Sequence, residues 1–142
     1  MEQGLTYEEY LDRYPRLVRT NVGTSMLPLL RQGRDLFVVE KRGPGRLRAG
    51  DVVLYRRPPD KYVLHRIVGV GETYTCIGDN QYALEHGIRQ DQLIAVVTAF
   101  VRDDREIPVT DLGYRIYCRL WHCFRPIKRV LGRCRRILFS HL

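Results

Sequence analysis

Residues 50–70, GDVVLYRRPPDKYVLHRIVGV, are the stretch that decides the fold. Two runs within it, residues 52–55 and 62–70, are rich in valine, leucine, isoleucine and tyrosine, and the turn formers Pro-Pro-Asp stand between them. Apolar runs of this length bounded by Gly, Pro and Asp are typical of β-strands joined by turns. The stretch therefore predicts two successive strands, entered through a Gly-Asp turn at residues 50–51.

Short apolar runs separated by turn residues also occur on both sides of this stretch. A buried strand is predicted at residues 36–39, and further short strands are predicted at residues 73–77 and 93–101. Residues 22–30 are predicted to form a strand that leads into a turn or helix start. Short strands separated by turn residues, without helical segments between them, favour an antiparallel sheet over alternating β and α units. The predicted fold class is therefore mainly β, an antiparallel and barrel-like domain.

Helical patterns occur only near the two ends of the chain. Thr6 and Glu9 have the spacing of a capping box, which predicts a short helix that ends before Pro15. After residue 112, apolar residues recur every three or four positions, and Pro126 is predicted to divide this pattern into two basic amphipathic helices. The expected parts are an N-terminal helical segment (residues 1–14), a β domain (residues 15–108) and a basic amphipathic helical tail (residues 109–142).

Charge is unevenly distributed along the chain. The 142 residues carry a net charge of +8, yet residues 1–112 contain 16 basic and 16 acidic residues, and residues 113–142 contain eight basic and no acidic residues. A neutral β domain argues against nucleic acid as a partner, because nucleic-acid binding needs positive charge over the folded surface. The tail, residues 112–140, instead suits an anionic membrane surface. Its apolar face could alternatively pack on the β domain or join two copies into a homo-oligomer.

Cysteine spacing and hydropathy argue against several other classes of protein. None of the four cysteines lies in a C-x-x-C motif, and their spacing to the histidines matches no zinc pattern. We therefore expect no metal and no cofactor, and reduced thiols as in a cytosol. No apolar run approaches the ~20 residues of a membrane span, and the acidic N-terminus lacks the apolar core of a signal peptide. The expected location is cytoplasmic, peripheral at the inner membrane face.

Three short islands carry residues with catalytic chemistry. Taken singly, each has an ordinary structural explanation: Ser25 as a turn residue, His65 as a core histidine and Asp79 as a turn former. Taken together and in this order, they supply a hydroxyl nucleophile, an imidazole base and a carboxylate that orients the base. The islands are Gly23-Thr24-Ser25-Met26-Leu27-Pro28, Leu64-His65-Arg66-Ile67 and Gly78-Asp79-Asn80.

These islands, with the Gly50-Asp51 turn between the first two, resemble the signal-peptidase and LexA-like family of serine peptidases. The resemblance spans about residues 20–100 and rests on Ser-Met-x-Pro, Gly-Asp, His-Arg and Gly-Asp-Asn in that order. It implies a β pseudo-barrel in which Ser25 is the nucleophile, His65 the general base and Asp79 the carboxylate that orients the base. Glu85 corresponds loosely to a second acidic residue in the branch of the family that uses histidine, whereas Asp51 is expected to be a turn residue.

The resemblance also implies how a substrate binds. The family holds its substrate as an extended strand beside the serine and the base. The backbone amides of Ser25 and Met26 are the expected oxyanion donors. The residues expected to bind the substrate strand are Asn21, Val22, Gly23, Thr24, Tyr62, Val63 and Leu64.

The implied activity is that of a serine endopeptidase that cleaves a specific peptide or protein precursor in trans. Only 24 residues precede Ser25, and they hold neither a membrane anchor nor a DNA-binding domain, so removal of secretory signals and self-cleaving repression are not expected. Removal of the leader from a modified peptide, at the cytosolic membrane face, fits by analogy. The alternative is a catalytically inactive peptide-binding module of the same fold.

Overall fold

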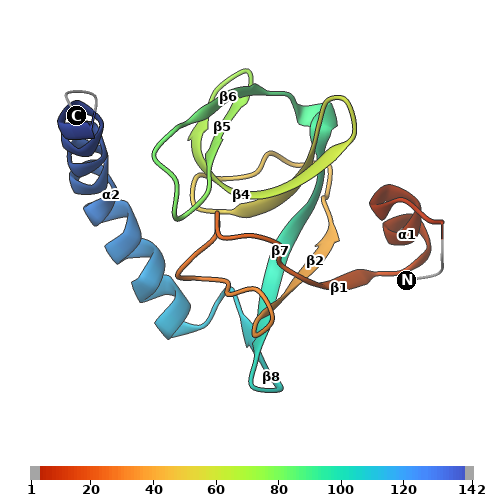
Figure 1. Ribbon diagram of the computed structural model, residues 1–142. Helices are drawn as coiled ribbons and strands as arrows, with labels where there is room; N and C mark the ends of the chain where they lie inside the picture. Colours follow the sequence, from red (N-terminus) through yellow and green to blue (C-terminus); the bar gives the residue numbers. More distant parts are fainter. Residues whose placement is uncertain (1–3, 140–142) are drawn as a thin grey trace. The chain divides into compact units, whose positions relative to one another are not determined.

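The computed structural model describes residues 4–139, with side chains described for residues 4–127 and for Val130. The fold is mainly antiparallel β, as predicted, with an α-helix near each end (Figure 1). The strands are β1 (Arg16–Thr20), β2 (Leu36–Lys41), β3 (Val52–Arg57), β4 (Lys61–Val70), β5 (Tyr74–Ile77), β6 (Glu85–Ile88), β7 (Leu93–Arg102) and β8 (Arg105–Pro108).

All eight strands belong to one sheet. Their order is β1-β2-β7-β3-β4-β5-β6, and β8 pairs with β7 off this path. Within the described chain, β1 and β6 at the two ends of the path do not pair with each other, so the sheet is not a closed barrel.

The stretch that predicts the fold lies in the middle of this sheet. β3 and β4 pair antiparallel, with Val53 opposite His65 and Tyr55 opposite Val63. Val53, Tyr55 and Ile67 are fully buried in a core cluster that also includes side chains from β5, β6 and β7. Burying one large aliphatic side chain stabilises a fold by about 1.5–3 kcal/mol. Burial of these side chains therefore fixes the β3–β4 hairpin and, with it, the backbone positions of the polar residues on its strands.

The strongly apolar strands β2, β3, β4, β5 and β7 lie where the sequence predicts them. The sequence did not predict β1, β6 and β8, which are short and contain charged residues. Residues 22–30 form the predicted turn, but the strand predicted within them is wrong, because β1 already ends at Thr20. The turn that carries Ser25 thus follows an edge strand.

Two helices flank the strands in the sequence. α1 (Tyr7–Arg13) has the predicted capping box: the Thr6 hydroxyl accepts a hydrogen bond from the Glu9 amide at 3.2 Å, and the Glu9 carboxylate accepts one from the Thr6 amide at 2.8 Å. α2 (Leu112–Phe139) follows Asp111, whose carboxylate accepts a hydrogen bond from the Tyr114 amide at 3.1 Å. The predicted division at Pro126 is wrong: a proline removes one hydrogen bond of the ladder, and α2 continues through it as one helix.

The chain divides into two compact units, Met1–Val109 and Thr110–Leu142. The first unit contains α1 and every strand, and the second contains α2. Neither helix in the described part of the chain has a stretch apolar enough to cross a membrane.

Candidate active site

A cavity of about 500 Å³ in the β unit is lined by both Ser25 and His65. Ser25 comes from the turn after β1 and His65 from the middle of β4, so the first two islands meet at this cavity. Of the residues predicted to bind substrate, Gly23 and Thr24 are not part of the lining. Those that do line the cavity are Asn21, Val22, Tyr62, Val63 and Leu64.

The third island holds the Ser25 turn in place. The Ser25 carbonyl accepts a hydrogen bond from the Asn80 amide at 2.8 Å, and the Asn80 side chain donates to the Thr24 carbonyl at 3.2 Å. A Cβ atom built on Gly78 would lie 2.5 Å from the Ser25 carbonyl oxygen and 3.1 Å from the Ser25 Cβ, so only glycine allows this approach. Met26 is fully buried directly after the serine. The turn is therefore anchored on both sides of the hydroxyl.

His65 is held by a tyrosine. Its Nδ1 lies 3.2 Å from the Tyr55 hydroxyl, and that hydroxyl donates a hydrogen bond to Glu85 Oε2 at 2.5 Å. Glu85 also accepts from Arg57, whose Nε lies 2.8 Å from Oε1. His65 is 5% exposed. Tyr55, Glu85 and Arg57 thus form a chain of polar groups behind the His65 ring.

Burial and charge act on the pKa of His65 in opposite directions. Burial is the largest influence and lowers the pKa; the Glu85 carboxylate raises it, the Arg57 guanidinium lowers it further, and Asp79 raises it slightly. The result is a pKa of about 4, below the ordinary value of 6.5. His65 is therefore neutral at neutral pH, which is the state a general base requires.

Asp79 is the counter-ion of Arg66. Its two carboxylate oxygens accept hydrogen bonds from Arg66 Nε at 2.8 Å and Arg66 Nη2 at 2.7 Å, and both side chains are almost completely buried. Arg66 also donates to the Gly50 carbonyl at 2.8 Å. The sequence prediction assigned Asp79 to orient the imidazole. In the structure the hydrogen bond at the His65 ring is with Tyr55, and both oxygens of Asp79 accept hydrogen bonds from Arg66.

Tyr55 is the site residue that sequence reasoning missed. It lies on β3 two residues beyond Val53, the direct partner of His65, which makes it a diagonal neighbour of the imidazole on the same face of the sheet. The alternation within residues 52–55 and 62–70 could have placed these two side chains on one face. Glu85 was indicated only by the family resemblance, and it reaches the site because β6 pairs with β5.

Two sets of backbone groups beside the cavity remain available to a bound peptide. Leu27 donates its amide to the Thr24 carbonyl, whereas in the described part of the chain the amides of Ser25 and Met26 donate to no protein atom. β4 pairs with β3 over residues 61–66, but it pairs with β5 only from Arg66 onward. Among the described strands, none covers the other edge of residues 61–65, which is the edge expected to receive the substrate.

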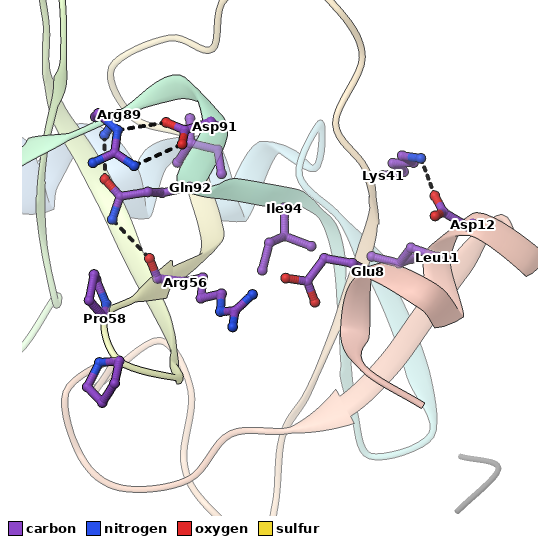
Figure 2. A pocket seen from close by; sticks show the side chains of 12 residues that line it. Glu8, Leu11, Asp12, Lys41, Arg56, Pro58, Arg89, Asp91, Gln92 and Ile94 are labelled. Carbon is purple, nitrogen blue, oxygen red and sulfur yellow. Dashed lines mark hydrogen bonds and ion pairs between the residues drawn. The ribbon is translucent and has the colours of Figure 1, made fainter. Parts of the chain in front are cut away.

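A second cavity of about 470 Å³ lies among residues of α1, the β3–β4 turn and the start of β7 (Figure 2). Its charged side chains are satisfied locally: Lys41 pairs with Asp12, and Arg89 pairs with Asp91 at 2.9 Å. Its lining includes no serine, cysteine or histidine. The cavity that holds Ser25 and His65 is therefore the better candidate for an active site.

No protein family, curated protein or solved structure matches this chain.

Proposed function

We propose that this chain is a serine endopeptidase in which Ser25 is the nucleophile and His65 the general base. One observation supports this most directly: residues from two separate islands, Ser25 and His65, line one cavity together with Tyr62, Val63 and Leu64 of the uncovered β4 edge. A strand edge beside a hydroxyl and an imidazole is what peptide cleavage needs, because backbone pairing fixes the scissile bond before chemistry begins.

The chemistry follows the established logic of serine peptidases. Ser25 Oγ forms a bond to the scissile carbonyl carbon while its proton passes to Nε2 of His65. The amides of Ser25 and Met26 donate hydrogen bonds to the oxyanion. His65 then protonates the leaving amine as the C–N bond breaks. Water hydrolyses the acyl-enzyme in the reverse sense, giving a proton to His65, which returns it to Ser25.

Asp79 has a supporting role in this proposal. Asp79, which forms an ion pair with Arg66, lies in the sequence between Gly78 and Asn80, and these two residues contact the Ser25 turn. We assign it to holding the third island in place, so that the turn carrying Ser25 keeps its position relative to β4.

The proposed substrate is a peptide or protein precursor that is cleaved in trans, with leader removal from a modified peptide as the candidate step. The uncovered edge of β4 also supports the alternative, an inactive peptide-binding module, because backbone pairing needs no catalysis. The two functions differ in whether the serine and histidine turn over bound peptide.

A cleavage assay on a diverse mixture of unmodified peptides, analysed by mass spectrometry, separates them. Wild-type protein should cut a subset of the peptides at defined bonds, and both Ser25→Ala and His65→Ala should abolish cutting. The matched controls are Ser140→Ala, which changes the only other serine, and His86→Ala, which changes an exposed histidine. Binding of peptides without cutting would favour the binding module, and cutting that survives Ser25→Ala would refute the proposal.

A further inference from the structure

We infer that Tyr55 is a positioning residue that fixes the tautomer of His65, with the proton on Nδ1 and the lone pair on Nε2. This inference rests on the proposed function and deepens it, since it explains how the base is prepared without a direct carboxylate contact. Two contacts support it: Nδ1 of His65 lies 3.2 Å from the hydroxyl oxygen of Tyr55, and that oxygen lies 2.5 Å from Oε2 of Glu85.

The number of available protons decides which nitrogen of His65 carries one. A tyrosine hydroxyl has one proton to donate and can also accept, whereas an ionised carboxylate can only accept. At 2.5 Å the oxygens of Tyr55 and Glu85 need a proton between them, and that proton comes from the hydroxyl. The hydroxyl can then only accept from His65, so Nδ1 must carry a proton. Neutral imidazole has a single N–H, and Nε2 is left free to take the proton of Ser25.

The charge state of Glu85 supports this count. Burial raises the pKa of Glu85, but hydrogen bonds from Arg57 and Tyr55 lower it more, and the net pKa is lowered. Glu85 is therefore ionised at neutral pH and cannot supply the proton itself. Arg57 donates to both oxygens of this carboxylate, from Nε to Oε1 and from Nη2 to Oε2, which keeps Glu85 aimed at the hydroxyl.

The same chain of contacts favours the imidazolium that forms during catalysis. Glu85 Oε2 lies 3.9 Å from His65 Nδ1, close enough for its negative charge to stabilise a protonated ring. Arg57 and burial oppose that charge, and Asp79 supports it weakly. Cys76 faces Tyr55 and Glu85 from β5, and burial raises the pKa of its thiol to about 12, so it stays neutral and does not compete.

The direct test is nuclear magnetic resonance of the full chain with isotope-labelled histidine. His65 should show the Nδ1–H tautomer, identified by loss of its signals in His65→Gln. Tyr55→Phe should shift the ring toward Nε2–H, and Tyr82→Phe, at an exposed tyrosine, should leave it unchanged. An Nε2–H tautomer in the wild-type protein would overturn the inference. This readout does not depend on peptidase activity, so its failure can be told apart from failure of the proposed function.

Kinetics provide a second test once a substrate is known. Tyr55→Phe should lower kcat by about a hundredfold with little change in KM, since general-base catalysis contributes about 10²–10⁴-fold. Glu85→Gln should move the acidic limb of kcat/KM to lower pH, because the Glu85 charge raises the pKa of His65. A purely structural role for Tyr55 would leave kcat of the folded variant unchanged, and an unmoved acidic limb in Glu85→Gln would contradict the electrostatic part.

A different feature, the apolar row of α2, supports a second inference. Six large side chains at three- and four-residue spacing are between 49% and 69% exposed, although helices normally bury such a row. The same helix, Leu112–Phe139, contains eight basic and no acidic residues. The exposed residues are Leu112, Ile116, Leu120, Phe124, Ile127 and Val130.

We propose that this row docks onto an anionic lipid surface. A helix with one apolar face and otherwise basic residues lies in the plane of a membrane interface, with its apolar side chains among the acyl chains and its cations at the headgroups. Charge complementarity favours lipid over a second copy of the chain, because two helices without acidic residues would repel each other electrostatically.

Co-sedimentation of the full chain with vesicles tests this proposal. It should bind vesicles of phosphatidylglycerol and phosphatidylcholine but not phosphatidylcholine alone, and binding should fall with added salt. Arg115→Gln should weaken binding about fivefold, from ~1 kcal/mol per cation, and Leu120→Ser with Phe124→Ser should abolish it. Arg105→Gln, outside the helix, is the control. Absence of binding to the anionic vesicles would overturn the proposal, as would self-association in sedimentation experiments that the same double substitution removes.

Discussion

Asp79→Asn separates the structural interpretation of the third island from the catalytic one. The substitution keeps the shape of the side chain and removes its charge, which leaves the Arg66 guanidinium without its carboxylate. Arg66 is 1% exposed and Asp79 is 1% exposed, so solvent cannot compensate the remaining charge. Breaking a buried ion pair on one side destabilises a protein by about 3–5 kcal/mol.

That loss is large compared with the total stability of a typical domain, about 5–15 kcal/mol. With a urea dependence of about 1–3 kcal/mol per molar, the unfolding midpoint of Asp79→Asn should fall by roughly 2 M. Urea titration followed by far-ultraviolet circular dichroism measures this shift. Asp91→Asn is the matched control, since it breaks the exposed pair with Arg89 and should leave the midpoint unchanged.

Activity measured on the same variant completes the test. If Asp79 supports the fold, the remaining cleavage activity of Asp79→Asn should follow the folded fraction as urea is added. A variant with the wild-type midpoint and no activity would refute this reasoning, and it would restore Asp79 to the orienting role that the sequence predicts.

Three further outcomes are expected. The pKa of His65 is about 4 in the folded chain and 6.5 in the unfolded chain, so the unfolded state binds a proton first as pH falls. The free energy of unfolding should therefore drop by roughly 3 kcal/mol between about pH 6.5 and pH 4. Measurements of unfolding against pH should show that His65→Gln lacks this part of the loss. Gly78→Ala places a Cβ 2.5 Å from the Ser25 carbonyl oxygen and should abolish cleavage while the chain stays folded, whereas Gly43→Ala, with no atom within 4 Å, should retain wild-type kinetics. Thr6→Ala removes the cap of α1 and should lower stability by about 1 kcal/mol in the urea titration; an unchanged midpoint would mean that α1 contributes nothing to the cooperative unit.

The amino-acid sequence by itself determined the features that depend on neighbouring residues. The apolar runs on either side of Pro-Pro-Asp specify β3 and β4, because strand formation follows local composition and turn chemistry. The capping box of α1 closes within three residues and is equally local. The islands with Ser25 and His65 could be identified from their residue types, and the fold places both residues at one cavity.

Tertiary structure alone decided which polar groups face each other. Both carboxylate oxygens of Asp79 accept hydrogen bonds from Arg66, a buried guanidinium thirteen residues away, whereas the His65 ring is bonded to Tyr55. Tyr55 reaches His65 through the register of β3 and β4, and Glu85 reaches Tyr55 only after β6 has paired with β5. The partner of a buried polar group depends on distances across the sheet, and those distances exist only once the strands have paired.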